Sequence, residues 1–254
     1  MALAGTLERF AAHGDGFKFT IKGGVALELR LRERARATKD LDLVLHDSVA
    51  DLARALERAI APDPEAAATE AGRRHQGFQF QRKKEPLQLE NGTINVALAV
   101  TYRGGAWTTI SVDVARAEPG EAEIELLDAV NFENALGIIG PATVPCLPLR
   151  YHIAQKLHAM TLSPRAGKRN ERSRDLIDLM LMETMVTDYA GVREACELVF
   201  ETRAKHGWPP PLVLPDHWRS EYTTLATDLG IPVTNAAEAM ARVRAMVARI
   251  QAAS

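Results

Sequence analysis

Two pairs of residues in this chain have the types and spacing for chemistry, a glycine pair (Gly23 and Gly24) and an Asp-x-Asp pair (Asp40 and Asp42). Glycines lack a Cβ and adopt positive φ, so the backbone can approach a phosphate group closely. A helix that begins at the glycines would direct its free N–H groups at an anion. On a strand the two carboxylates would share one face and could hold Mg²⁺ ions about 4 Å apart. Such ions polarise an α-phosphate and activate an attacking hydroxyl, so this order of residues is typical of nucleotidyl transfer.

Each pair alone has an ordinary structural explanation. A glycine pair is usually a turn, and an Asp-x-Asp pair is usually a solvated strand edge. Here Thr38 and Lys39 directly precede the acids, and the whole combination in this order favours a functional site. We therefore predict that Gly23, Gly24, Thr38 and Lys39 contact a nucleoside triphosphate and that the two aspartates bind metal.

A third carboxylate is predicted from a strand pattern. In the apolar-alternating run 107–114, Ser111 and Asp113 share one face while branched apolar residues occupy the other. An acid inside such a strand is costly unless it is paired, hydrogen-bonded or bound to metal. Asp113 is therefore a candidate catalytic residue and metal ligand. The exposed face of an edge strand explains it equally well.

A second group of residues lies on two helices predicted over 149–162 and 171–187. Lys156 on the first would neutralise the β- and γ-phosphates of the nucleotide, and Asp178 on the second would orient it. The alternatives are a surface lysine whose stem covers apolar side chains and an ordinary helical ion pair between Arg174 and Asp178.

The charge distribution is uneven although the formal net charge is only −2. Between Arg150 and Arg174 there are seven basic residues and one acid. Charge runs are most often solvated faces, but this run lies among the suspected catalytic residues, which favours a phosphate-rich ligand. We predict that four cations between the two helices follow an RNA backbone: Arg165, Lys168, Arg169 and Arg172.

Composition sets broader limits. The chain has 254 residues, of which 46% are hydrophobic and 25% are charged, as in ordinary soluble proteins. Neither a membrane-spanning apolar run nor the apolar core of a signal peptide is evident, so we expect a cytoplasmic protein. Cys146 and Cys196 are far apart in the sequence, which argues against a disulfide framework or a structural zinc site.

The pattern predicts an α/β domain over residues 1–140 and a helical domain over 141–254. The hairpin signal comes from two alternating runs, 94–102 and 107–114, around a Gly-Gly turn. Further strands are expected over 40–46 and around Phe78 and Phe80. Helices are predicted over 3–12, 24–33, 48–60, 149–162, 171–187, 189–204 and 236–252, with a proline-rich connector over 207–219.

The segment from Lys22 to Leu43, together with Lys156 and the Arg-Asp-Leu-Ile-Asp-Leu run at 174–179, resembles the AbiEii/AbiGii nucleotidyltransferase toxin family. The resemblance covers roughly residues 18 to 185. It implies an α+β fold, with a DNA polymerase β-like nucleotidyltransferase core containing a mixed sheet and then a helical C-terminal half. Members are toxins of bacterial toxin–antitoxin or abortive-infection pairs, and some add nucleotides to the 3′ end of tRNA.

The resemblance also assigns roles to individual residues. Thr38 stands where the family usually has Ser, and the usual Gly-Ser of nucleotidyltransferases is Gly-Gly here, so Thr38 is expected to supply the missing hydroxyl. The other matches are Gly23 and Gly24 as phosphate-contacting glycines, Asp40 and Asp42 as metal ligands, and Lys156 and Asp178 as the later motif. Asp113 is not part of this family motif.

These observations lead to one principal functional hypothesis. We expect an Mg²⁺-dependent enzyme that uses an NTP to modify an RNA, with the 3′ end of tRNA as acceptor and a cognate antitoxin as partner. One alternative is a small-molecule nucleotidyltransferase of the aminoglycoside-modifying type, although the basic run favours a polyanionic acceptor. Another is a catalytically silent nucleotide-binding or partner-binding module, against which Asp40, Asp42 and Lys156 argue.

Overall fold

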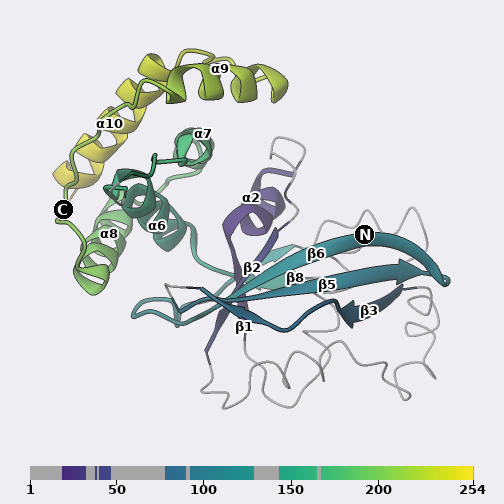
Figure 1. Ribbon diagram of the computed structural model, residues 1–254. Helices are drawn as coiled ribbons and strands as arrows, with labels where there is room; N and C mark the ends of the chain where they lie inside the picture. Colours follow the sequence, from purple (N-terminus) through teal and green to yellow (C-terminus); the bar gives the residue numbers. More distant parts are fainter. Residues whose placement is uncertain are drawn as a thin grey trace. The chain divides into compact units, whose positions relative to one another are not determined.

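The computed structural model describes residues 19–32, 38, 40–46, 78–89, 92–128, 143–164 and 167–253 (Figure 1). These residues form two compact units. The first unit contains the described residues up to Ala117 together with Ile124–Leu147, and the second contains Glu118–Glu123 and the described residues from Pro148 onward. The helices predicted over 3–12 and 48–60, and the site residues Lys39 and Arg165, lie outside the described residues.

The first unit is built on a mixed sheet, as the sequence predicts. In the described part of the chain the sheet has eight strands in the order β3-β5-β6-β2-β1-β8-β7, with β4 paired to β5. Strand β2 is parallel to β6 and antiparallel to β1. The strands are β1 (Phe19–Lys22), β2 (Asp40–Leu45), β3 (Phe78–Arg82), β4 (Leu87–Gln88), β5 (Ile94–Tyr102), β6 (Gly105–Arg116), β7 (Glu125–Asp128) and β8 (Thr143–Cys146).

One face of this sheet carries the core of the first unit. Leu41, Leu43 and Leu45 of β2 are buried, whereas Asp40 is exposed and Asp42 is half-buried. The alternation predicted for β2 is therefore confirmed. The apolar face also includes the buried residues of β5 and β6 and part of helix α2 (Gly23–Leu31). The helix expected over 24–33 is thus present.

The predicted hairpin is formed by β5 and β6. A two-residue turn, Arg103–Gly104, joins the strands, and both residues have positive φ (49° and 81°). Such turns match the twist of the paired strands. Strand β6 is longer than predicted, because it begins at Gly105 and continues to Arg116.

The second unit is helical. Its helices are α6 (Leu149–Thr161), α7 (Ser173–Glu183), α8 (Tyr189–Arg203), α9 (Trp218–Asp228) and α10 (Ala236–Ala252). Four of the five were predicted with ends within a few residues. Helix α9 was not, although Trp218 and Tyr222 are fully buried at helical spacing. No helix among the described residues is long and apolar enough to span a bilayer.

Candidate functional site

The two glycines form the start of α2, directly after β1. Gly23 opens the helix with a φ of +64°, and a Cβ at this position would collide with the carboxylate of Asp42. A Cβ at Gly24 would lie 2.8 Å from Thr38 Oγ1 and 2.9 Å from Thr38 Cβ. The glycines therefore allow Thr38 and Asp42 to approach the first turn of α2 closely. The absence of a Cβ would allow a ligand to do the same.

Thr38 is held by the backbone that follows it. Its hydroxyl donates to the carbonyl oxygen of Asp40 at 3.3 Å, and it can accept from the amide of Asp40 at 3.4 Å. Both contacts are long, so they leave the hydroxyl able to exchange partners. The residues that the sequence singled out around positions 23, 24, 38 and 42 are thus brought together.

Strand pairing places the predicted carboxylates on one face. In the parallel register of β2 and β6, Asp40 is opposite Ser111 and Asp42 is opposite Asp113. Paired residues of adjacent strands point to the same face, with strands about 4.8 Å apart. The third carboxylate proposed from the strand pattern is thus a direct neighbour of Asp42 on an interior strand, and the edge-strand explanation is wrong.

Asn95 is a member of this group that the sequence analysis missed. Its side-chain amide donates to Asp113 Oδ1 at 2.5 Å and to Ser111 Oγ at 2.8 Å. In the β5–β6 register Asn95 is directly opposite Asp113. The available signal was the same as for Asp113, a polar residue between Ile94 and Val96 in an apolar strand.

The chemistry of these donors fits a divalent cation of the Mg²⁺ type. Asp40, Asp42 and Asp113 offer hard carboxylate oxygens, the ligands that such cations prefer. Among the described residues, however, no three His, Cys, Asp or Glu side chains converge closely enough to form a ready metal site. The three aspartates could therefore hold Mg²⁺ only after their side chains adjust.

Lys156 lies in a buried ion-pair cluster within the second unit. Its Nζ is 2.7 Å from Asp175 Oδ1 and 2.7 Å from Asp178 Oδ2. Lys156 is 9% exposed, Asp175 is 6% exposed and Asp178 is fully buried. The surface-lysine alternative is therefore wrong, and the expected closeness of Lys156 to Asp178 is present. Asp175 was not predicted as a partner.

The ammonium group of Lys156 remains charged. Burial works to lower its pKa, but the carboxylates of Asp175 and Asp178 raise that pKa above its ordinary value. The cluster therefore joins α6 to α7 with the Lys156 cation between two anions, and Arg172 adds a longer contact to Asp175 at 3.7 Å. To contact a phosphate, Lys156 would have to exchange a carboxylate oxygen for a phosphate oxygen.

The loop between α6 and α7 presents the predicted RNA-binding cations. Lys168, Arg169 and Arg172 are exposed. Asn170 anchors the loop, because its side chain donates to the carbonyl of Met160 at 2.9 Å and its own carbonyl accepts from Trp218 Nε1 at 2.7 Å. Lys168 and Arg169 thus precede the anchored residue Asn170 in the loop, and Arg172 follows it.

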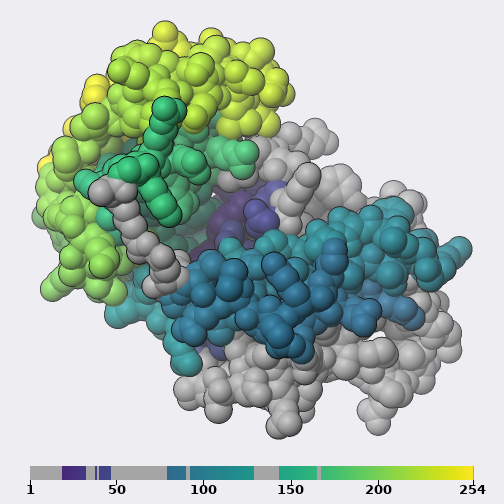
Figure 2. Space-filling view, in the orientation of Figure 1, coloured from purple at the N-terminus to yellow at the C-terminus, as the bar shows by residue number. Residues whose placement is uncertain are grey.

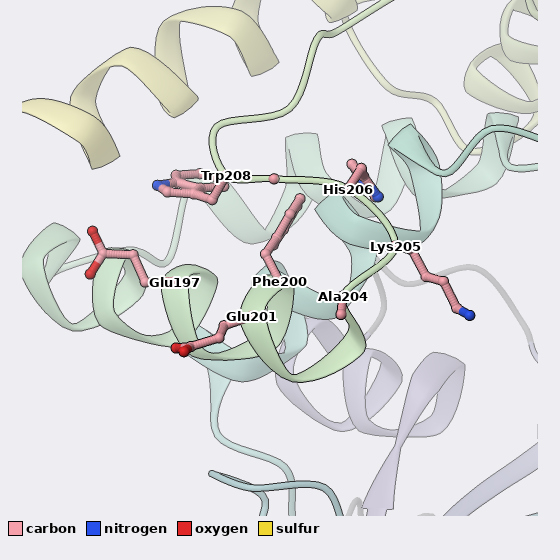
Figure 3. Close-up of a pocket in the computed structure, with 8 residues that line it drawn as sticks. Glu197, Phe200, Glu201, Ala204, Lys205, His206 and Trp208 are labelled. Carbon is pink, nitrogen blue, oxygen red and sulfur yellow. The ribbon is translucent and has the colours of Figure 1, made fainter.

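A separate hollow of about 580 Å³ lies at the end of α8 (Figure 3). Phe200 and Trp208 meet edge to face there, with ring centroids 5.3 Å apart, and Glu197 and Glu201 lie along the helix. Beside Phe200, burial lowers the pKa of His158 to about 4, so its ring is neutral. None of the predicted site residues lines this hollow.

Comparison with known families identifies the chain. The family model for the AbiEii toxin, described as a nucleotidyl transferase of a type IV toxin–antitoxin system, matches residues 6–248. The chain belongs to this family. The resemblance seen in the motifs is therefore confirmed, and this AbiEii-family chain is a nucleotidyltransferase toxin.

One solved structure supports the fold of the chain. The AbiEii-family chain matches the nucleotidyltransferase toxin MenT4 from Mycobacterium tuberculosis with a TM-score of 0.66 and 20% identity, over 100% of this chain and 82% of that one. Two further matches are weaker. An antigenic nucleotidyltransferase-like protein from Paracoccidioides brasiliensis gives a TM-score of 0.44 at 16% identity, over 80% of this chain and 88% of that one. The antibiotic-resistance factor ANT(2'')-Ia gives a TM-score of 0.41 at 16% identity, over 80% of this chain and 91% of that one. No curated protein matches.

Proposed function

We propose that this toxin is an Mg²⁺-dependent enzyme that transfers a nucleoside monophosphate from an NTP to the 3′ end of an RNA, with tRNA as the acceptor. The single observation that carries the proposal is the register of β2 and β6, in which Asp42 and Asp113 are neighbours on one sheet face. This pair lies beside the glycine-opened start of α2, where Gly23 faces the carboxylate of Asp42.

The residues of the first unit divide the work of binding. The free N–H groups at the start of α2 hold the triphosphate, together with the hydroxyl of Thr38 and the cation of Lys39. Asp40, Asp42 and Asp113 would hold Mg²⁺, which when bound polarises the α-phosphate and makes the attacking hydroxyl more acidic. Asn95 donates to one oxygen of Asp113, and the other oxygen would be available to a metal ion.

The reaction is an in-line displacement at the α-phosphorus. The 3′-hydroxyl oxygen of the acceptor forms a new bond to the α-phosphorus, and the bond from that phosphorus to the bridging oxygen breaks. The electron pair leaves with pyrophosphate, and the hydroxyl proton passes to a carboxylate of the Asp42–Asp113 group. Lys156, oriented by Asp178, neutralises charge on the β- and γ-phosphates, so it acts electrostatically as pyrophosphate leaves.

The exposed cations between α6 and α7 hold the acceptor. Lys168, Arg169 and Arg172, together with Arg165, contact phosphates without reading the base sequence. A polyanion suits this loop better than a cationic drug does, because the drug would be repelled. A cognate antitoxin neutralises the activity, as the type IV toxin–antitoxin description of the family implies.

The test is to incubate the protein with each α-labelled NTP, Mg²⁺ and total tRNA and to separate the products on a denaturing gel. We expect one or more NTPs to label tRNA, and we expect no labelling by wild-type protein when excess EDTA replaces Mg²⁺ or by Asp42→Asn protein with Mg²⁺ present. Absence of labelled RNA with every NTP would refute the proposal. Transfer to an aminoglycoside in place of RNA would support the small-molecule alternative.

A further inference from the structure

A face of polar and small residues extends from the carboxylates across three strands of the first unit. Residues opposite each other in adjacent strands share a face, so the registers define it. Ala97 is opposite Ser111, and Ala99 lies between Gln81 and Thr109. We call this surface the lateral face: Ser111 and Thr109 of β6, Asn95, Ala97 and Ala99 of β5, Gln81 of β3 and Lys83, which follows β3.

Lys83 extends the lateral face beyond the regular pairing. Its amide donates to the carbonyl of Ala97 at 2.9 Å, and its Nζ donates to Thr109 Oγ1 at 3.4 Å. The pair of Lys83 and Thr109 therefore bridges from the end of β3 over β5 to β6, a distance of two strand spacings or about 10 Å. Its ammonium group is thereby held on the same face as the carboxylates.

The lateral face is accessible and leads to the carboxylate of Asp113. Gln81, Lys83 and Thr109 are exposed, and the remaining members are half-buried. Strands β3, β5 and β6 are neighbours in the sheet (Figure 1), and atoms of this blue and teal part of the chain lie at the molecular surface in Figure 2. Because Asn95 is opposite Asp113, the lateral face ends at the carboxylates.

The chemistry of the lateral face suits a nucleic acid. Strands β3, β5 and β6 contain one acid only, Asp113, at the end where metal would bind. Away from it the face offers hydroxyl and amide groups and one cation, the groups that contact phosphate and sugar oxygens. Ala97 and Ala99 have short side chains, so a chain laid over them can approach the sheet closely.

From these observations we propose that the lateral face binds the single-stranded 3′ end of the acceptor, with its terminal hydroxyl at Asp113 and the preceding nucleotides crossing β6 and β5 toward Lys83. This assignment rests on the proposed function. The lateral face would then be a second RNA contact, besides the loop between α6 and α7. It would position the reacting end of the RNA rather than its body.

Two adjacent threonines allow a matched test. Thr109 and Thr108 are both exposed, but Thr109 is opposite Ala99 on the lateral face, whereas Thr108 is opposite the buried Val100 on the other face. Thr109→Glu and Thr108→Glu therefore add the same charge at neighbouring positions on opposite faces. The probe is a fluorescein-labelled single-stranded RNA ending in CCA, with binding followed by anisotropy in the full chain at several salt concentrations.

Thr109→Glu should weaken binding of this RNA about tenfold by placing an anion near its phosphates. Thr108→Glu should leave binding within about twofold, because its charge lies on the opposite face. Lys83→Gln should reduce the log–log salt slope by about 0.7, the value for one single-strand phosphate contact. Gln81→Glu, which changes charge but hardly shape, should weaken binding in the same direction as Thr109→Glu.

The outcomes separate this inference from the proposed function. If wild-type protein neither binds nor labels RNA, the proposed function fails and the lateral face loses its ligand. If wild type binds and labels RNA while Thr109→Glu, Gln81→Glu and Lys83→Gln bind as wild type does, only the lateral-face assignment is overturned. Equal losses in Thr109→Glu and Thr108→Glu would also overturn it, because such losses would not depend on the face.

Discussion

Replacing Lys156 by methionine tests whether the buried cluster serves the chemistry or only the fold. The change retains the length and apolar stem of the side chain but removes the ammonium group. The carboxylates of Asp175 and Asp178, each 2.7 Å from Nζ in the wild type, would then be buried together without their cation. Removing one partner of a buried ion pair costs about 3–5 kcal/mol, so Lys156→Met should lose this much stability at pH 8.

The pH dependence of that loss follows from the carboxylates. Without Lys156, burial and like-charge repulsion raise their pKa values in the folded variant above the unfolded value of about 3.9. A carboxyl group whose folded pKa is raised favours folding at low pH and loses that contribution as pH rises through the folded pKa. The stability deficit of Lys156→Met should therefore be smaller at pH 5 than at pH 8. In the wild type the pKa of Lys156 is raised, so its contribution is lost only above the ordinary lysine value of about 10.4.

Urea unfolding followed by circular dichroism at pH 5 and pH 8 measures both effects. The triple variant Lys156→Met/Asp175→Asn/Asp178→Asn has no buried charge in the cluster and should recover most of the lost stability. Its transfer rate should still be about 100-fold below wild type if the lysine acts on the triphosphate. A Lys156→Met deficit below about 1 kcal/mol, or one that does not change with pH, would refute the ion-pair reasoning. A stable triple variant with wild-type turnover would leave the cluster a purely structural link.

Three other outcomes are expected. Asp42→Ala should abolish nucleotidyl transfer while the melting temperature stays near that of wild type, and near-normal transfer would remove Asp42 from the site. Lys168→Gln/Arg169→Gln should lower the log–log salt slope of RNA binding by about 1.4 without changing NTP affinity, and an unchanged slope would leave the loop a solvated surface. Because burial lowers the pKa of His158 to about 4, the unfolded chain binds its proton first, so wild type should lose stability as the pH falls from 6.5 to 4. His158→Gln should flatten that part of the stability curve in urea unfolding, and an identical curve would contradict the assignment.

The sequence allowed the local part of the site to be predicted but not its long-range pairing. Alternation in β2 was sufficient to place Asp40 and Asp42 on one face of the strand and the buried leucines on the other. It could not show that Asp42 lies beside Asp113, because that depends on β2 pairing with β6, which follows it by many residues. Asn95 was missed for the same reason, since its role exists only through its cross-strand neighbour.

Elements that break local rules were also missed. Strand β8 contains Pro145 within only four residues, so it did not read as a strand, although β8 pairs with both β1 and β7. Helix α9 was hidden because the prolines at 209–211 and 215 dominated the pattern up to Trp218. Asp175 follows Arg174 on the second helix, and only the fold of α7 against α6 shows that it faces Lys156.

The assignment of Glu118–Glu123 to the second unit has a consequence for the covalent connectivity of the chain. The backbone passes between the units after Ala117, after Glu123 and after Leu147, so at least three peptide tethers join them. The short excursion is anchored on the helical side, where Glu118 accepts from Arg203 at 2.9 Å and Glu121 accepts from Gln155 at 2.6 Å. A single proteolytic nick at any one tether would leave the two halves connected, and a gene fragment cut at one point would deprive one half of residues that it needs.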